Sequence, residues 1–544
     1  MRTTAISGPA SGRYLVGFDL RRRPHLESDV LVVGGGVAGL CAALAAAERG
    51  SEVLLLVKSS LSESNTHYAQ GGVAAVLGEG ERESRDEVEL HVQDTLQAGA
   101  GLCDEQVVRE LLGGAAAAIE LLRRHGCRFD HGADGHLALA REGGHSARRI
   151  LHAHGDSTGA EVARSLASAV AAHPQITVVD HAFAIDLLSA TPGGRVLGVL
   201  YHRREELVAA LAGATVLATG GCGWVWRETS NPPVATGDGL AMAYRAGAEL
   251  MDLEFMQFHP TTLYIAGGAR LLITEAMRGE GAVLKDNAGE RFMPRYHPAA
   301  ELAPRDVVTR AIMAEIRASS FPHVWLDATH LGGPFLAERF PTIAQACMRF
   351  GIDIARQWIP VHPSAHYHCG GLRSDARGAT SLPGLWSAGE VGCTGLHGAN
   401  RLASNSILEG LVVGIRAGGD AAGKGGAPGR VRLSEARGEA ASDSLDVPDL
   451  VRSLRALMWR QVGIERNAGD LAMASRSLAF WSSHQARGEF RTREGWELQN
   501  LLLVGSIIAA AALSRGHGIG THTRTDEQGA PDLTHHVMQR AETP

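Results

Sequence analysis

Lysine is nearly absent from this chain of 544 residues. Lys58, Lys285 and Lys424 are the three lysines among 52 basic residues, and 59 acidic residues leave a formal net charge of −7. A chain of this charge has no general attraction for nucleic acid or for an anionic membrane surface. We therefore expect neither kind of partner, although a local basic site can still bind a small anion.

Cysteine is also scarce, and none of the seven cysteines forms a C-x-x-C pair. This argues against a disulfide framework, a zinc site or an iron–sulfur cluster, and it favours a reducing compartment such as the cytoplasm. No metal is expected. The longest apolar run, residues 501–513, is shorter than the roughly 18–20 residues of a membrane span and predicts a buried helix. Residues 1–25 lack the apolar segment of a secretory signal.

Glycine, in contrast, is abundant at 67 residues, and it follows several predicted strands. Residues 29–33 form a β-branched run that ends in glycine. A helix rich in alanine over 38–49 and a second strand over 52–57 complete a β-α-β unit. Apolar runs at 214–218 and 385–388 also end in glycine. This pattern predicts an α/β fold with a Rossmann-like, doubly wound sheet.

The chain is too long for one hydrophobic core, which stops growing at about 250–300 residues. Residues 418–449 are rich in glycine and alanine and predict a linker, whereas the tail after Ser514 predicts irregular structure. The predicted units are a flexible N-terminal extension (1–28), a dinucleotide-binding domain in two segments (29–253 and 367–430), an α+β capping insertion (254–366) and a C-terminal helical domain (431–544).

A dinucleotide-binding turn is predicted at Gly34-x-Gly36-x-x-Gly39, which follows a strand and opens a helix. The glycines allow a tight turn and a close approach of the backbone to a pyrophosphate at the helix N-terminus. An NAD site has an acidic residue at the end of the second strand, but this chain has Lys58 there. The later segments Thr219-Gly-Gly and Gly-Leu-Trp-Ser-Ala-Gly-Glu390 are similar to the flavin-contacting signatures of FAD proteins. We therefore expect FAD rather than NAD.

Longer motifs carry a resemblance to a known family. Together they resemble the succinate dehydrogenase/fumarate reductase flavoprotein superfamily, over residues 29 to about 420, with a weaker extension at 458–464. The motifs are residues 64–72 (SNTHYAQGG), 141–146 (REGGHS), 258–261 (FHPT), 274–281 (TEAMRGEG), 303–306 (APRD), 365–371 (AHYHCGG) and 395–406 (GLHGANRLASNS).

The resemblance implies a set of residues that bind FAD. Covalent members of the superfamily have a histidine bonded to the flavin, and Asn65 occupies that position here, so FAD is expected to be noncovalent. The expected FAD-binding residues are Gly34, Gly35, Gly36, Val37, Ala38, Gly39, Lys58, Asn65, Thr66, His67, Tyr68, Ala69, Gln70, Gly71, Gly72, Asp238, Glu390, Ser406 and Ile407.

The resemblance also implies a four-carbon dicarboxylate as substrate, bound between the FAD domain and the capping insertion. Such a ligand needs cations or hydrogen-bond donors at both ends, and an arginine can hold a carboxylate through two parallel hydrogen bonds. Glu275 is expected to line the site, although it could instead pair with a nearby arginine. The expected carboxylate ligands are His259, Thr274, His366 and Arg401.

Arg305 matches the superfamily position that transfers a proton. Because free arginine has a pKa above about 12, this role requires a buried site with neighbouring groups that exchange the proton. Glu275 and Asp306 are the candidates for such a relay. The alternative is a structural salt bridge at a helix terminus.

Glu142 is expected to select the substrate. Succinate and fumarate enzymes of the superfamily lack a carboxylate there, and an amino dicarboxylate differs from succinate by an ammonium on C2. A buried anion facing that ammonium would discriminate between the two, because an unpaired buried charge is costly. The alternative is a surface ion pair of Glu142 with Arg141 or Arg148.

The resemblance therefore implies oxidation of L-aspartate to iminoaspartate, with catalytic roles for Arg305, Glu142, His259, His366 and Arg401. O₂ or fumarate would be the acceptor, and the product would feed quinolinate and NAD synthesis, with a functional link to quinolinate synthase. A monomer or weak homodimer is expected. Two alternatives stay open: a fumarate reductase-like or succinate dehydrogenase-like flavoprotein subunit, and a flavin-binding protein without catalytic activity.

Overall fold

A computed structural model describes residues 2–9, 12–268, 270–426, 431–436, 446–485, 489–527 and 535–541. Its centre is a seven-stranded sheet in the order β8-β4-β3-β11-β10-β9, with β18 beside β11. Strands β8, β4, β3, β11 and β18 pair in parallel, whereas β9 and β10 form an antiparallel extension. The strands are β3 (His25–Val33), β4 (Val53–Leu56), β8 (Ile176–Val179), β9 (Phe183–Ser189), β10 (Val196–Arg203), β11 (Glu206–Leu217) and β18 (Leu385–Ser387).

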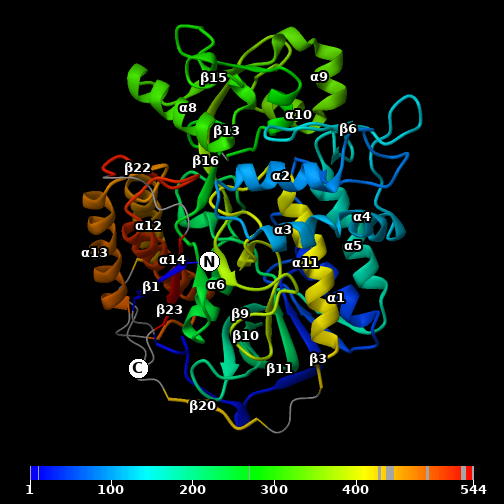
Figure 1. The fold of residues 1–544 in the computed structure, drawn as a ribbon. Helices are drawn as coiled ribbons and strands as arrows, with labels where there is room; N and C mark the ends of the chain where they lie inside the picture. Colours follow the sequence, from blue (N-terminus) through cyan, green and yellow to red (C-terminus); the bar gives the residue numbers. More distant parts are fainter. Residues whose placement is uncertain are drawn as a thin grey trace.

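Helices cover both faces of this sheet (Figure 1). Neighbouring residues of β3 point to opposite faces, as the period of a strand requires. Val30 and Val32 pack into the core beside α1 and α11, and Leu31 and Val33 pack into the core beside α6 and α14. The helices on the first side are α1 (Val37–Ala47), α2 (Val88–Ala98), α3 (Glu105–Leu112), α4 (Ala115–Arg124), α5 (Thr158–Ala172) and α11 (Asn405–Ala422).

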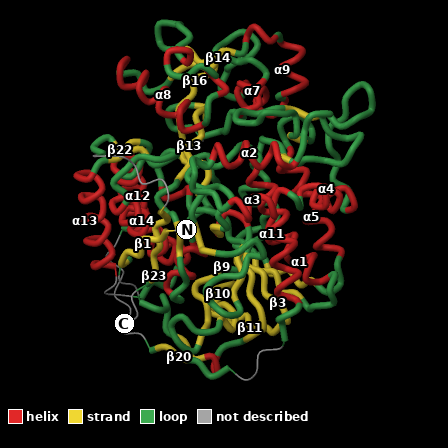
Figure 2. The backbone as a smooth tube through the Cα atoms, viewed as in Figure 1, coloured by secondary structure: helices red, strands yellow, loops and turns green. Residues whose placement is uncertain are grey.

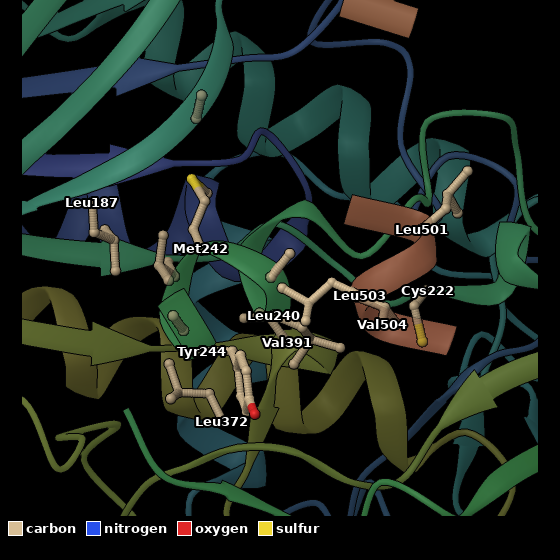
Figure 3. Packing of buried hydrophobic residues seen from close by; sticks show 14 of the residues in the cluster. Leu187, Cys222, Leu240, Met242, Tyr244, Leu372, Val391, Leu501, Leu503 and Val504 are labelled. Carbon is tan, nitrogen blue, oxygen red and sulfur yellow. The ribbon is translucent and has the colours of Figure 1, made fainter. Parts of the chain in front are cut away.

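The second side is built largely from the C-terminal part of the chain. Figure 3 shows Leu240 of α6 (Asp238–Arg245) near Leu503 and Val504 of α14. By length and composition alone α14 could cross a membrane, but 67% of its apolar window is buried inside the protein. The buried helix predicted at 501–513 is thus part of a longer core helix. The C-terminal helices are α12 (Val447–Gln461), α13 (Ala468–Gln485) and α14 (Arg493–Ser514).

The predicted insertion has a sheet of its own, in the order β13-β16-β15-β14, above the main sheet in Figures 1 and 2. Its helices enclose a separate apolar core that includes Leu263, Phe292 and Ile359. The domain limits given above stay predictions. The elements here are β13 (Met256–Leu263), α7 (Glu275–Gly279), β14 (Val283–Lys285), α8 (Arg305–Ser319), β15 (Val324–Asp327), α9 (Gly333–Arg339), α10 (Pro341–Met348) and β16 (Ile359–His368).

The prediction of a flexible N-terminal extension over 1–28 is wrong for the described residues. Strand β1 pairs in parallel with β23 at the edge of a five-stranded sheet in the order β1-β23-β12-β17-β19. Tyr14 and Phe18 are buried in the main core with their rings in edge-to-face contact. The sheet consists of β1 (Arg2–Ser7), β12 (Leu250–Met251), β17 (Gly371–Arg373), β19 (Gly392–Cys393) and β23 (His535–Arg540).

The tail after Ser514 also differs from the prediction of irregular structure. Besides β23, it contributes Thr523 and Arg524 to a short parallel pair with Glu465 and Arg466. Both apolar and electrostatic contacts hold the tail in this ordered structure. The electrostatic contact is a buried ion pair, in which Arg515 lies 2.5 Å from Glu254. The remaining short strands are β2 (Phe18–Asp19), β5 (Val73–Ala74), β6 (Leu139–Ala140), β7 (Ile150–Leu151), β20 (Ser434–Glu435), β21 (Glu465–Arg466) and β22 (Thr523–Arg524).

The predicted linker over 418–449 begins too early, because α11 continues to Ala422. A Cβ atom on Gly414 would lie 2.5 Å from the carbonyl oxygen of Ala38, and one on Gly418 would lie 2.1 Å from that of Ala42. These glycines let α11 pack directly on the backbone of α1, which closes the first side of the sheet. Residues 427–430 and 437–445 of the predicted linker lie outside the described residues.

Candidate active site

A cavity of about 240 Å³ lies between the glycine-ended strands of the main sheet and the capping insertion. It brings together most of the residues predicted for FAD and substrate. Those that line it are Gly34, Gly35, Gly36, Val37, Ala38, Lys58, Asn65, Thr66, Tyr68, Ala69, Gln70, Gly71, Gly72, Asp238, His259, Thr274, Glu275, Arg305, His366, Glu390, Arg401, Ser406 and Ile407.

Three predicted residues lie outside the cavity wall. His67 is exposed, and its ring contacts Tyr68. Gly39 is buried within α1, where a Cβ atom would lie 1.9 Å from the carbonyl oxygen of Gly34. Its role is therefore to let the helix approach the turn. Glu142 is buried and does not line the cavity.

The dinucleotide turn has the geometry that its sequence predicts. Gly34 has a φ of +117°, and its position leaves no room for a Cβ atom beside Ala218. Gly36 is the N-cap of α1 and offers no side chain to the first backbone N–H groups of the helix. Thr66 accepts a hydrogen bond from Val37 N at 3.1 Å. The positive end of α1 thus faces the cavity, as a pyrophosphate site requires.

Lys58 contacts protein groups from three segments. Its Nζ atom donates to Asp238 Oδ2 and Thr236 Oγ1, each at 2.7 Å, and lies 2.9 Å from Glu497 of α14. Burial would raise the pKa of Asp238, but Lys58 and hydrogen bonds from Asn500 and Thr236 lower it. Asp238 is therefore a fixed anion beside a cation at this end of the cavity. The C-terminal helix, which sequence reasoning did not connect to the cofactor site, holds both groups in place.

Glu390 is a partly buried carboxyl group that also lines the cavity. It accepts a hydrogen bond from His368 N at 2.9 Å and one from Asn65 Nδ2 at 3.3 Å. Burial raises its pKa to about 7, against the lowering effect of these hydrogen bonds and of Arg401. A Cβ atom on Gly221 would lie 2.1 Å from this carboxyl group. Glycine is therefore needed there for Glu390 to reach the cavity.

This raised pKa predicts how the stability of the apoprotein depends on pH. The pKa of Glu390 in the folded state lies above the ordinary value of 4.5. The stabilisation of the folded state by the protonated carboxyl group is therefore complete below about pH 4.5 and is lost as the pH rises through 7. Glu390→Gln should therefore stabilise the apoprotein at pH 8, by up to about 3 kcal/mol, and change it little at pH 5. Thermal unfolding of both proteins at the two pH values measures this. A difference in stability between the two proteins that is the same at pH 5 and pH 8 would contradict the raised pKa of Glu390.

The polar wall of the cavity fits FAD. Within the described part of the chain, Asn65 Oδ1, Gln70 Oε1 and Thr219 Oγ1 are buried without a hydrogen-bond partner. Such groups are costly unless a ligand satisfies them. A Cβ atom on Gly36 would have its nearest neighbour at 3.4 Å, and one on Gly71 would have it at 3.6 Å. The backbone there is open to a ligand, whereas the turn at Gly34 and Gly39 is closed by packing.

Cationic and donor groups gather at the substrate end of the cavity. The rings of His259 on β13 and His366 on β16 lie 5.1 Å apart in edge-to-face contact. Burial, together with Arg305 and Arg401, lowers the pKa of both histidines well below 6.5, so both are neutral at pH 7. Ser230, which sequence reasoning missed, lies 2.9 Å from His366 Nδ1.

Gln257 is a second residue that sequence reasoning missed. Its Oε1 atom accepts hydrogen bonds from Arg305 at 3.0 Å and from Arg401 at 3.1 Å. Its Nε2 atom donates to Asn400 Oδ1 at 2.7 Å and to the Arg401 carbonyl oxygen at 2.8 Å. A neutral side chain thus orients two arginines without cancelling their charge. Burial and Arg305 lower the pKa of Arg401 to about 10. The only sequence signal was its position two residues before His259.

Arg305 lies at the N-terminus of α8 and is 8% exposed. Its Nε atom donates to Glu275 Oε2 at 2.5 Å, and Glu275 Oε1 lies 3.5 Å from Arg278. Both interpretations of Glu275 therefore hold, since it lines the cavity and pairs with arginines. Asp306 instead accepts a hydrogen bond from Asn400 and pairs with Arg310. Of the two predicted relay candidates, only Glu275 touches Arg305 in these contacts.

Glu142 is 3% exposed, which excludes the surface ion pair with Arg141 or Arg148. Ser404 Oγ donates to its Oε2 atom at 2.7 Å, and His152 Nε2 lies 3.7 Å from its Oε1 atom. Burial would raise the pKa of Glu142, but His152, Ser404 and Arg305 together lower it to about 2. A buried anion is therefore present, as predicted, but its partner Ser404 lines the cavity whereas Glu142 itself does not.

Known proteins resemble this chain over most of its length. The FAD binding domain family matches residues 29–407. The L-aspartate oxidase of Streptomyces coelicolor is 44% identical, and the match covers 95% of this chain and 92% of that protein. The L-aspartate oxidase of Mycobacterium tuberculosis is 46% identical, with 92% of each chain covered. This chain belongs to the L-aspartate oxidase family.

Membership of the L-aspartate oxidase family confirms three predictions: the α/β fold with an FAD-binding domain, FAD as the cofactor, and an oxidoreductase as the class of protein. A solved structure of Escherichia coli quinol fumarate reductase FrdA is also similar. Its TM-score is 0.86 at 31% identity, with 95% of this chain and 94% of that chain covered. The L-aspartate oxidase family thus shares its fold with the superfamily predicted from the sequence motifs.

Proposed function

We propose that this chain oxidises L-aspartate to iminoaspartate, with FAD as cofactor and O₂ or fumarate as the final acceptor. The main supporting observation is the buried anion Glu142, which accepts a hydrogen bond from Ser404 in the cavity wall, in the same cavity as Arg305, Arg401 and two neutral histidines. A dicarboxylate needs those donors, and only a substrate with an ammonium group needs the anion. The sequence identity to L-aspartate oxidases supports the same substrate.

Substrate binding rests on Arg401, His259, His366 and Thr274. Arg401 can hold one carboxylate through parallel hydrogen bonds, and its Nε atom has no partner among the described residues. The two neutral histidines can donate to carboxylate oxygens. Since a bound dianion would offset the charge of Arg305 and Arg401, it would also raise the pKa of both histidines. Binding of both carboxylates speeds the reaction mainly because it orients the C2–H bond.

When bound, FAD supplies the acceptor for the two electrons released from the C2–H bond. Residues of the chain transfer the proton. In fumarate reduction Arg305 would donate a proton to carbon, and Glu275 would return one to it across the 2.5 Å contact. Burial lowers the pKa of Arg278 on the other side of Glu275, which makes proton exchange along this path less costly.

Glu142→Gln tests the choice of substrate. The amide keeps an oxygen that accepts from Ser404 but loses the negative charge. We expect oxidation of L-aspartate to lose about 10- to 100-fold in kcat/KM, since a hydrogen bond to a charged group contributes about 1.5–3 kcal/mol. Fumarate reduction with a reduced viologen should stay within about threefold. Glu161→Gln is the control, because Glu161 is a buried carboxylate paired with Arg164 away from the cavity. Equal loss of both activities would remove Glu142 from this role.

The alternative functions predict different behaviour of the purified chain. A succinate dehydrogenase-like subunit would oxidise succinate with an electron-transfer partner and would not turn over L-aspartate with O₂. A flavin-binding protein without activity would keep its flavin absorbance when L-aspartate is added without oxygen. We favour the oxidase, with quinolinate and NAD synthesis as the use of its product, a cytoplasmic location, and a monomer or weak homodimer as its assembly.

A further inference from the structure

An aromatic ring lies against the guanidinium group of Arg401. The Cζ atom of Arg401 lies over the ring of Tyr367, 4.8 Å from the ring centroid. Both residues line the cavity, and they are 3% and 6% exposed. A cation over an aromatic ring is attracted by the ring quadrupole, and the attraction is strongest where water is excluded. The ring of Tyr367 therefore restricts how the Arg401 side chain can turn.

Hydrogen bonds hold the same guanidinium group at both of its terminal nitrogens. Nη2 donates to Gln257 Oε1 at 3.1 Å, and Nη1 donates to the Leu402 carbonyl oxygen at 3.3 Å and to Ser406 Oγ at 3.4 Å. All three acceptors are neutral, so these contacts orient the group and leave its charge in place. The Nε atom has no partner among the described residues. A carboxylate accepts two parallel hydrogen bonds only when an edge of the group faces it.

Tyr367 is itself held by a buried anion. Its hydroxyl donates to Glu409 Oε2 at 3.0 Å, and this carboxylate also lies 2.9 Å from His397 Nε2 and accepts from Thr394 Oγ1 at 2.8 Å. Burial would raise the pKa of Glu409, but these three neighbours together lower it. If the ring turned away from Arg401, Glu409 would lose one of its donors, which is costly in a buried site. The position of the ring on β16 is thus fixed from α11.

We propose that Tyr367 is a positioning residue that holds the Arg401 guanidinium in the orientation required by a substrate carboxylate. This inference deepens the proposed function and rests on the role of Arg401 given there. The competing role for Tyr367 is packing alone, since it also belongs to a small apolar cluster with Phe255 and Ile519. The two roles differ in one respect: an effect that acts through Arg401 disappears when Arg401 is removed, whereas a packing effect does not.

Variants of Tyr367 separate its ring from its hydroxyl. Tyr367→Met keeps much of the volume without a ring, whereas Tyr367→Phe keeps the ring and loses the hydrogen bond to Glu409. Arg401→Gln, alone and together with Tyr367→Met, completes a double-mutant cycle. Tyr264→Leu is the matched control, because Arg270 lies over the Tyr264 ring at 4.4 Å and Tyr264 does not line the cavity.

Two measurements on the FAD-loaded enzyme read out the variants. Perturbation of the flavin spectrum by succinate gives the dissociation constant for a dicarboxylate. Stopped-flow reduction of the flavin by L-aspartate without oxygen gives the dissociation constant and the limiting rate for the substrate. Flavin absorbance and thermal unfolding verify that each variant is loaded with FAD and folded.

We expect Tyr367→Met to weaken the binding of both ligands about 10-fold, whereas Tyr367→Phe stays within about threefold of the wild type because the ring remains. When Arg401 is already glutamine, Tyr367→Met should weaken succinate binding by less than about twofold further. Tyr264→Leu should change neither dissociation constant.

Three results would overturn the inference: unchanged binding in Tyr367→Met, equal weakening in Tyr367→Phe and Tyr367→Met, or the full additional loss when Arg401 is glutamine. If Arg401→Gln alone binds succinate as the wild type does, the carboxylate role of Arg401 fails and the inference fails with it. If the wild-type enzyme is not reduced by L-aspartate, the proposed oxidase fails, while the succinate cycle still tests Tyr367. The failures are therefore distinguishable.

Discussion

Arg305→Lys is expected to slow fumarate reduction about 100- to 10,000-fold, the range typical of a lost general acid. Lysine keeps the positive charge beside Glu275, so the buried carboxylate is not left without a partner. Its single ammonium cannot reproduce the planar group that contacts Glu275 through Nε and Gln257 through Nη1. The expected loss of activity would therefore come from the changed position of the donated proton, because the charge of the site stays the same.

The control for this variant lies on the same helix. Arg310 pairs with Asp306, both side chains are partly exposed, and a pair open to solvent contributes little. Arg310→Lys should therefore keep full activity. Steady-state rates with a reduced viologen and fumarate, at saturating substrate, measure kcat for both variants, and flavin absorbance verifies that FAD stays bound. An Arg305→Lys enzyme with an unchanged kcat would show that another group moves the proton.

Gly39→Ala is expected to yield a protein that purifies without FAD. The new Cβ atom would lie 1.9 Å from the carbonyl oxygen of Gly34, and because this contact is with backbone, no side-chain rotation can relieve it. Overpacking of this kind costs about 1–3 kcal/mol, which converts to about 10- to 100-fold in FAD affinity when the pyrophosphate turn is displaced. The ratio of flavin to protein absorbance after purification, and titration of the apoprotein with FAD, measure the effect.

Gly78→Ala is the matched control for this change. Gly78 is exposed, and a Cβ atom there would have no neighbour within 4 Å. This variant should retain FAD and unfold at the wild-type temperature. If Gly39→Ala also kept its FAD at the wild-type affinity, close packing between α1 and the turn would not be what positions the cofactor site.

The parts of the site that the sequence predicted are those that local rules determine. A strand that ends in glycine places its carboxyl end at the edge of the sheet, so Gly34 and Gly389, far apart in sequence, meet at one cavity. The motif residues His259, Arg305 and Arg401 line the same cavity, although they come from β13, α8 and the segment before α11. Lys58 was predicted from its place at the end of β4.

The missed features depend on contacts that no local pattern encodes. Gly418 resembles linker sequence, and only its packing on Ala42 identifies it as part of a helix interface. Gln257 is an ordinary polar residue of a strand until two arginines from other elements meet it. Glu142 was correctly expected to be a buried anion, but the sequence does not show that it bonds to Ser404 and does not itself line the cavity.

The pairing of β1 with β23 has a consequence for biosynthesis. Residues 2–7 have one strand partner among the described residues, and it is residues 535–540. At about 5–20 residues per second, a ribosome needs roughly half a minute to two minutes between these segments, and β1 is without its partner for that time. The sequence RTTAIS is short and largely polar, so it can stay in water without joining other chains. The five-stranded sheet is thus completed only after residues 535–540 have been made.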